Sequence, residues 1–213
     1  MLTWGRFSDW DIDRALIEQV LSEDELFRCM RIRVDDAQSC ALHSRYFLRV
    51  LLGERLGQDP ETLVFSYSEH GKPSVAGIEF NVSHSANIWA CVTSKKSTLG
   101  FDIEKIPPFS SRMAERFFCK KELAYLAEGD KSLRFARLWA GKEAVIKHQG
   151  GRVLDGIKRY HIDFKTQRHA VVGDDRSQMH LEYIEVDPEY VACLCVQEPV
   201  QVSLEQLEMS KLI

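Results

Sequence analysis

Residues 88–104 read Ile88-Trp89-Ala90-Cys91-Val92-Thr93, a turn at Lys95-Lys96-Ser97, and then Leu99-Gly100-Phe101-Asp102-Ile103-Glu104. Hydrophobic and polar residues alternate in both segments, which is typical of the two strands of a hairpin. The pattern recurs near the end of the chain, in Tyr190-Val191-Ala192-Cys193-Leu194-Cys195 and Val200-Gln201-Val202-Ser203-Leu204-Glu205. This repetition predicts an α+β fold of two similar halves related by a pseudo-twofold axis. Ser203 replaces Asp102 in the second copy, so only one half carries the polar site.

Helix and strand signals elsewhere agree with an α+β fold. The capping box Ser22-Glu23-Asp24-Glu25 begins a helix to about Arg33, and a second helix, over 36–56, stops at Gly57. Further helices are predicted at 112–117, 120–127 and 132–147, and further strands at 63–67, 80–82, 160–164, 180–186 and 190–196. We assign residues 1–105 to an N-terminal half and residues 106–213 to a C-terminal half.

The composition excludes several classes of protein. The 213 residues include 28 Lys and Arg against 32 Asp and Glu, a net charge of −4, so the basic excess of a typical nucleic-acid-binding protein is missing. No apolar run approaches the roughly 18 residues that span a membrane, and charges interrupt the first residues where a signal peptide needs an apolar block. The six cysteines form no C-x-x-C pair. We therefore expect a cytoplasmic protein with free thiols.

Two carboxylates mark the central strand. Asp102 and Glu104 are two residues apart, so they share one face with Cα atoms about 6.6 Å apart, while Phe101 and Ile103 share the other face. Neighbouring carboxylates repel each other unless a cation or a proton lies between them. Mg²⁺ prefers oxygen ligands of this kind, often together with substrate phosphates. The pair therefore indicates either a metal site or the solvated outer face of an amphipathic strand.

A second polar group lies in the predicted helix 132–147. Trp139, Glu143 and Lys147 follow one another at intervals of four residues and so line one helix face. An exposed Glu–Lys pair is the simpler interpretation, but a tryptophan on the same stripe favours burial. Glu143 is then a third carboxylate beside Asp102 and Glu104, and Lys147 is a cation for a phosphate. Gly141 lowers the helix propensity by up to about 1 kcal/mol and is expected to permit close approach of a ligand or strand.

Two further motifs leave alternatives open. Asn81-Val82-Ser83-His84-Ser85 is either ordinary turn chemistry or, with Lys72, a group that converges on phosphate oxygens. The absence of a G-x-S-x-G motif argues against a serine hydrolase. Glu122 lies three residues after Cys119, where it can cap a helix start or act in catalysis.

Taken in chain order, these motifs resemble those of the Sfp-like 4′-phosphopantetheinyl transferases, over roughly half the chain from about Arg45 to Gly151. The matching segments are Gly71-Lys72-Pro73, Phe80-Asn81-Val82-Ser83-His84-Ser85, Gly100-Phe101-Asp102-Ile103-Glu104, Phe117-Phe118 with Glu122, and Trp139 through Lys147. The resemblance implies the pseudo-dimeric fold of that family, with coenzyme A in the cleft between the halves. One departure is Cys119, where many relatives carry a serine or threonine cap.

The resemblance also assigns roles to individual residues. It implies that Asp102, Glu104 and Glu143 bind Mg²⁺. It implies that coenzyme A is held by Arg45, Lys72, Pro73, Ser83, His84 and Lys147, of which Lys147 contacts the pyrophosphate. Arg28, Arg31 and Arg33 align only loosely with further phosphate-binding positions.

The implied reaction is attack by a carrier-protein serine on the β-phosphorus of coenzyme A, which releases the 3′,5′-bisphosphate nucleotide. A carboxylate is expected to accept the serine proton. Glu143 and Glu122 are both candidates, and our hypothesis places Glu143 mainly on the metal and Glu122 nearby as base or water-positioner. The alternatives are a Mg²⁺-dependent nucleotide pyrophosphohydrolase and a non-catalytic scaffold that binds carrier proteins or coenzyme A.

The partner is expected to be an apo acyl or peptidyl carrier protein, and such proteins are usually acidic. Because this chain is itself acidic, attraction has to be local. The candidate docking surface consists of Arg112, Arg116, Lys120 and Lys121, interleaved with Met113, Phe117 and Phe118. An ordinary solvated helix is the alternative. A chain with both halves contains a whole cleft, so we expect a monomer.

Overall fold

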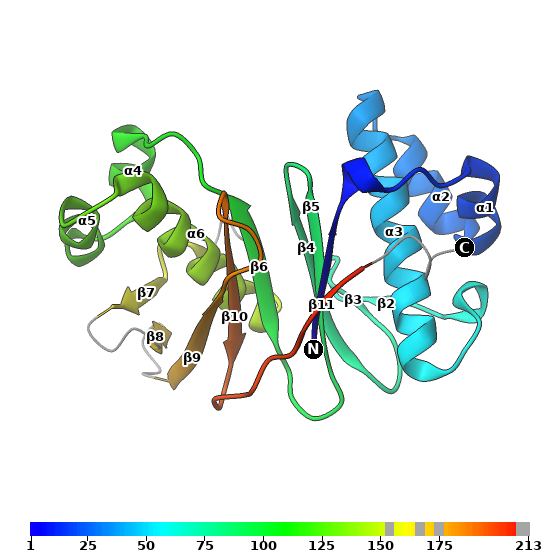
Figure 1. Cartoon of the computed structure of the whole chain (residues 1–213). Helices are drawn as coiled ribbons and strands as arrows, with labels where there is room; N and C mark the ends of the chain where they lie inside the picture. Colours follow the sequence, from blue (N-terminus) through cyan, green and yellow to red (C-terminus); the bar gives the residue numbers. More distant parts are fainter. Residues whose placement is uncertain (152–155, 165–168, 173–176, 208–213) are drawn as a thin grey trace.

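The computed structural model describes residues 1–151, 156–164, 169–172 and 177–207. Two β-sheets face each other, and a long helix covers the outer face of each sheet, which gives the four layers seen in Figure 1. The predicted α+β class is therefore confirmed. Across the described ranges, the helices are too short or too polar to cross a lipid bilayer.

The first sheet has the strand order β11-β1-β5-β4. Its strands are β1 (Leu2–Arg6), β4 (Glu79–Ser85), β5 (Ile88–Ser94) and β11 (Leu204–Gln206). The helices beside it are α1 (Arg14–Val20), α2 (Glu23–Met30) and α3 (Asp35–Leu56). Phe47 of α3 packs with Trp10 and Trp89 in the core beneath this sheet. The small β2 (Ser66–Tyr67) and β3 (Pro73–Ser74) form a separate two-stranded sheet.

The second sheet has the strand order β6-β10-β9-β8-β7. Its strands are β6 (Gly100–Lys105), β7 (Tyr160–Asp163), β8 (His169–Val172), β9 (Ser177–Ile184) and β10 (Tyr190–Val196). The helices beside it are α4 (Ser111–Phe117), α5 (Lys120–Ala127) and α6 (Lys131–His148). Helix α6 crosses the outer face of this sheet (Figure 1), where Leu138, Ala144 and Val145 are fully buried.

A third apolar core lies between the two sheets. Phe101 and Ile103 of β6 face this core, together with Ile88, Ala192 and Leu194. Since side chains alternate along a strand, Asp102 and Glu104 point the other way, toward α6. The predicted assignment of the two faces of β6 is therefore confirmed, and the carboxylate face is covered by a helix rather than by bulk solvent.

The predicted hairpins are wrong. β5 pairs with β1 and β4, whereas β6 pairs with β10, so the chain changes sheet between them. β10 likewise remains in the second sheet while β11 returns to the first sheet beside β1. The repeated pattern thus marks two crossings in opposite directions, because alternation determines which face is buried but not which strand is the neighbour.

Most predicted elements appear with shifted ends, and some were not predicted. The Ser22–Glu25 capping box is present, and α3 ends at Gly57 in the left-handed region with φ +67°. The predicted strand at 80–82 is longer than expected, because β4 also includes Ser83 to Ser85, for which turn chemistry was one alternative. The elements β1, α1 and β8 were not predicted. The division at residue 105 remains a prediction, although by strand pairing the chain changes sheet earlier, between Ser94 and Gly100.

Candidate functional site

Three carboxylates meet where α6 crosses β6. Asp102, Glu104 and Glu143 each place one oxygen within 4.8 Å of the others. Gly100 makes this possible, because a Cβ atom there would lie only 2.0 Å from the carbonyl oxygen of Ala144 in α6. A second glycine, Gly141, allows α6 to approach strands β7 and β9 on its other side, as the sequence predicts. The two glycines bring the helix close enough for its polar face to reach the strand carboxylates.

Lys147 forms the ionic contact across this site. Its Nζ donates to Asp102 Oδ1 at 2.6 Å and to Ser83 Oγ at 3.0 Å, and it lies 3.8 Å from Glu143 Oε2. Asp102 is almost fully buried, and its second oxygen, Oδ2, has no hydrogen-bond partner among the described residues. A buried carboxylate oxygen without a partner is costly unless a cation coordinates it. The donor set therefore fits a hard divalent cation such as Mg²⁺.

The two glutamates are held by hydrogen bonds from outside the triad. Ser85 Oγ donates to Glu104 Oε2 at 2.8 Å, and Trp139 Nε1 donates to Glu143 Oε1 at 2.8 Å. The sequence did not assign these roles to Ser85 and Trp139. For Ser85 the residue spacing offered a clue. Ser83 and Ser85 on β4 each lie 19 residues before the carboxylate on β6 to which they donate.

The electrostatics of the site favour a cation. Burial, followed by repulsion from Asp102, raises the pKa of Glu104 to about 7. The same two causes, in the same order, raise the pKa of Glu143 to about 7. Burial alone would lower the pKa of Lys147, but Asp102 and Glu143 outweigh it and raise the pKa. One ammonium thus faces three carboxylates, so the site lacks positive charge when all of them are ionised.

A cleft of about 340 Å³ opens beside the carboxylates, between α3 and α6. It contains most of the residues predicted for the site, namely Arg45, Pro73, Ser83, His84, Asp102, Glu104, Glu143 and Lys147. The cationic and hydrogen-bonding groups come from α3 and β4, on the side of the first sheet. The carboxylates come from β6 and α6, on the side of the second sheet. The cleft thus combines a candidate anion-binding wall, made of Arg45, Ser83 and His84, with a candidate metal site.

Comparison with known proteins identifies the family. The family model of the 4′-phosphopantetheinyl transferase superfamily matches residues 98–195. The chain is 30% identical to the 4′-phosphopantetheinyl transferase Sfp of Bacillus subtilis, over 93% of each chain. The chain belongs to the 4′-phosphopantetheinyl transferase superfamily. It is also 35% identical to the 4′-phosphopantetheinyl transferase HetI of a Nostoc species, over 65% of this chain and 62% of that one. A putative transferase of Synechocystis is 31% identical, over 79% and 74%.

Lys72 of the transferase lies behind the cleft rather than in its lining. Its Nζ donates to the carbonyl oxygens of Lys147 at 2.8 Å and Leu99 at 3.4 Å. The first of these carbonyls belongs to the last turn of α6, where a cation is favourable. Burial lowers the pKa of Lys72. In this conformation Lys72 joins the β2–β3 region to the end of α6 and to the loop before β6. Its predicted contact with coenzyme A remains a prediction.

Glu122 of the transferase is not brought together with the three carboxylates. It is 1% exposed and its Oε2 accepts hydrogen bonds from the backbone N of Cys119 and from Lys142 Nζ. Its Oε1 accepts from the backbone N of Ile162 at 3.2 Å. Of the two interpretations left open by the sequence, the structure shows the helix cap. The buried ion pair with Lys142 was not predicted, because neighbouring positions 142 and 143 point to different sides of α6.

Proposed function

We propose that the transferase moves the 4′-phosphopantetheine group of coenzyme A onto a serine of an apo acyl or peptidyl carrier protein in a Mg²⁺-dependent reaction. The products would be holo carrier protein and 3′,5′-ADP. Within the described part of the chain, Asp102 Oδ2 has no hydrogen-bond partner, and this oxygen in the carboxylate triad is the observation that carries the proposal. Membership of the superfamily supports the donor and the class of acceptor.

Asp102, Glu104 and Glu143 would hold the metal ion. Mg²⁺ bound there supplies positive charge that neutralises the pyrophosphate of coenzyme A. Lys147 adds a second positive charge beside Asp102, on the side of the site that faces Ser83. Fixed charges that await the developing negative charge are the main contribution of a protein to phosphoryl transfer.

The anion-binding wall of the cleft would hold the nucleotide part of coenzyme A. Arg45 from α3, with Ser83 and His84 from β4, offers one permanent cation and two hydrogen-bonding groups, and Pro73 lies beside them. Burial, and then the charge of Lys147, lowers the pKa of His84. A phosphate bound beside the imidazole would act in the opposite direction and favour its protonated form. Both sheets contribute to this cleft, and we therefore propose that the transferase works as a monomer.

The proton of the acceptor serine requires a base. Between the two candidates from the sequence, Glu143 lines the cleft, whereas Glu122 is buried in the core and accepts three hydrogen bonds there. We assign proton acceptance to Glu143, directly or through a water molecule. Glu122 is then a structural residue that anchors Lys142.

The carrier protein would approach over α4 and the start of α5. Arg112, Arg116, Lys120 and Lys121 are all exposed there, and Met113 is 40% exposed. Phe118 is buried and therefore leaves the predicted docking surface. A cavity of about 200 Å³ between Met113, Pro108 and Trp139 reaches Glu104, so this surface adjoins the carboxylates.

Intact-mass spectrometry tests the reaction. An apo carrier protein incubated with the transferase, coenzyme A and Mg²⁺ should gain one phosphopantetheine group. Asp102→Asn should abolish the gain, and Glu189→Gln, an equivalent change at an exposed carboxylate, should leave it intact.

The alternatives give different results in the same experiment. Cleavage of coenzyme A in the absence of a carrier, with every carrier unmodified, would identify the hydrolase. Binding of coenzyme A without cleavage or transfer, across fatty-acid, polyketide and peptide carriers, would identify the scaffold.

A further inference from the structure

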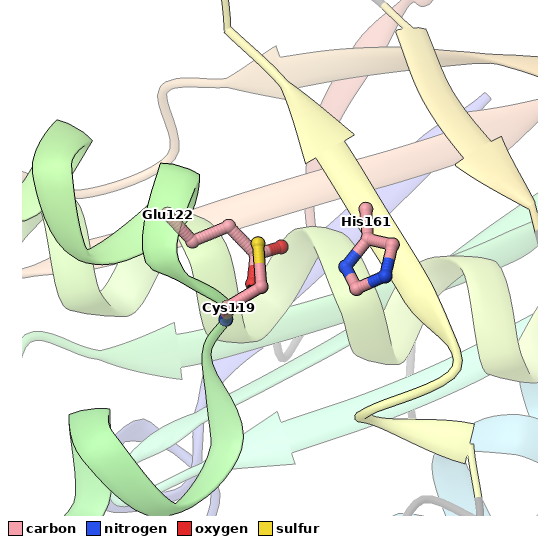
Figure 2. A group of neighbouring side chains, drawn as sticks. All are labelled: Cys119, Glu122 and His161. Atoms are coloured by element: carbon pink, nitrogen blue, oxygen red, sulfur yellow. Dashed lines mark hydrogen bonds between the residues drawn. The ribbon is translucent and has the colours of Figure 1, made fainter.

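A second group of metal-ligating side chains lies away from the carboxylate triad. Cys119, Glu122 and His161 each place one ligand atom within 4.8 Å of the others. Cys119 and Glu122 belong to the first residues of α5, and His161 comes from strand β7. Figure 2 shows the imidazole of His161 on the side of β7 that faces the other two side chains.

The carboxylate of this cluster is fixed in place with coordination capacity to spare. Glu122 Oε2 accepts two hydrogen bonds, from Lys142 Nζ at 2.8 Å and from the backbone N of Cys119 at 2.9 Å. Oε1 accepts one longer hydrogen bond, from the backbone N of Ile162 at 3.2 Å. Since a carboxylate oxygen has two lone pairs, Oε1 retains one for a metal ion.

The other two ligands are more accessible than Glu122. Cys119 is half-buried and its thiol is not in a disulfide. His161 is exposed, while its neighbours Tyr160 and Ile162 on β7 are buried. His161 is thus the member of the cluster that reaches solvent, and Glu122 is the buried one. The strand itself stays anchored by the hydrogen bond from Ile162 to Glu122.

The chemistry of the three donors differs from that of the triad. A thiolate, an imidazole and a carboxylate together suit Zn²⁺, whereas Mg²⁺ takes oxygen ligands alone. Zn–S bonds are about 2.3 Å long, and Zn–N and Zn–O bonds are about 2.1 Å long. With these bond lengths, the ligand atoms around a tetrahedral Zn²⁺ ion lie roughly 3.4–3.6 Å apart. Closing the cluster from 4.8 Å or less requires shifts of about 1 Å, within reach of the exposed His161 side chain.

We propose that Cys119, Glu122 and His161 form a Zn²⁺ site, in which a water molecule completes the tetrahedron. Binding would release the thiol proton of Cys119, because a coordinating thiol is deprotonated. The ammonium of Lys142 remains on Oε2 and balances one of the two ligand charges. The ion would join the start of α5 to β7, the outermost strand of the second sheet.

Absorption spectroscopy with Co²⁺ tests the site, using the reduced, metal-free full-length protein. Co²⁺ bound to a thiolate gives a near-ultraviolet charge-transfer band, which Co²⁺ in the all-oxygen triad does not give. We expect a band that saturates at one Co²⁺ per chain and that Zn²⁺ abolishes by displacement. Cys119→Ser and His161→Asn should each lose it, and Cys40→Ser, at a half-buried cysteine of α3, should keep it.

Thermal unfolding separates the site from nonspecific binding. With the carboxylate triad saturated by excess Mg²⁺, Zn²⁺ should raise the midpoint of wild-type protein and of Cys40→Ser, but not that of Cys119→Ser. Serine is a good helix cap, so Cys119→Ser should fold, and circular dichroism checks this. Absence of the charge-transfer band in wild-type protein, or its persistence in Cys119→Ser, would overturn the proposal. Either result leaves the proposed transfer reaction untouched.

Discussion

Ser83 Oγ donates a 2.7 Å hydrogen bond to Asp102 Oδ1, and this bond joins the edge strand of one sheet to the edge strand of the other. Two further hydrogen bonds connect the same two strands. The side chain of Asn81 accepts from the backbone N of Phe101, and Ser85 donates to Glu104. Alternate residues of β4 thus hold β6 in register, and the same contacts orient two of the candidate metal ligands.

Ser85→Ala removes the hydrogen bond that orients Glu104. Because Ser85 does not line the cleft, we expect the Mg²⁺ concentration for half-maximal rate to rise roughly tenfold, as for loss of a hydrogen bond to a charged group. The KM for coenzyme A should stay the same. Initial rates over a Mg²⁺ series measure both quantities, and an unchanged Mg²⁺ requirement would show that Ser85 does not position Glu104.

The raised pKa values of Glu104 and Glu143 predict how stability depends on pH in the absence of metal. A carboxyl whose pKa is raised from its ordinary value of 4.5 to about 7 by folding holds its proton more tightly in the folded state. The free energy of unfolding should therefore decrease as pH rises from about 4.5 to 7. Thermal melts in EDTA between pH 5 and 8 measure this loss, and Mg²⁺ at pH 8 should restore the midpoint.

Glu104→Gln provides the matching variant. It removes one of the repelling charges, so in EDTA at pH 8 it should stabilise the protein by about 1–2 kcal/mol, or roughly 2–8 °C, after allowance for partial exposure. The same variant should lose the response to Mg²⁺. A lower midpoint in EDTA would contradict the electrostatic explanation.

Glu122 and Glu143 should differ in what their loss changes. Glu122→Gln leaves the buried ammonium of Lys142 without its counter-charge, so we expect a loss of about 3–5 kcal/mol in the free energy of unfolding. Turnover at a temperature where the variant is folded should remain near wild type. Glu143→Gln should fold well and lose turnover by at least roughly a hundredfold. Melting curves and single-turnover rates on both variants check the distinction, and the opposite pattern would make Glu122 the base.

Gly100→Ala should separate α6 from β6. The added Cβ atom would meet backbone atoms of Ala144 at 2.0 Å and His148 at 2.3 Å, which cannot rotate away. We expect loss of Mg²⁺ binding and a lower melting temperature. Gly151→Ala is the control, since its Cβ would meet nothing closer than 3.5 Å. Isothermal titration with Mg²⁺ and thermal melts compare the two, and equal behaviour would show that α6 tolerates the displacement.

Arg116→Glu tests the proposed docking surface. The reversal of an exposed charge on α4 should raise the KM for an acidic carrier protein several-fold at low ionic strength, and added salt should reduce the difference. The KM for coenzyme A should not change. Lys96→Glu, at an exposed turn residue, is the control. A carrier KM equal to that of the control would remove α4 from the interface.

The sequence predicted the local parts of the site well. Period-two alternation gives Asp102 and Glu104 a common face, and four-residue spacing gives Glu143 and Lys147 a common face, because both depend only on backbone geometry. The neighbour of β6 is β10, about 90 residues further along the chain. The alternation of residues within a strand does not indicate which strand pairs with it. The hairpin prediction failed for this reason.

Burial explains the other differences. The position of Glu122 after Cys119 suits a cap and a base equally, and only the core around it, with Lys142 and Ile162, distinguishes them. The contact of Lys72 with a phosphate of coenzyme A, which the family resemblance implies, remains a prediction. In the structure, Lys72 contacts carbonyl oxygens of a helix end and a distant loop, which no local pattern encodes.

The two crossings between the sheets determine how the cleft can move. Each sheet contains a strand supplied by the other part of the chain, since β6 leaves the first region for the second sheet and β11 returns. A bend between the sheets would have to open the apolar core that they share and break the hydrogen bonds from Ser83 to Asp102 and from Ser85 to Glu104. The anion-binding wall and the carboxylates therefore sit in a preorganised frame of fixed width, and adaptation to different carrier proteins falls to surface side chains rather than to domain closure.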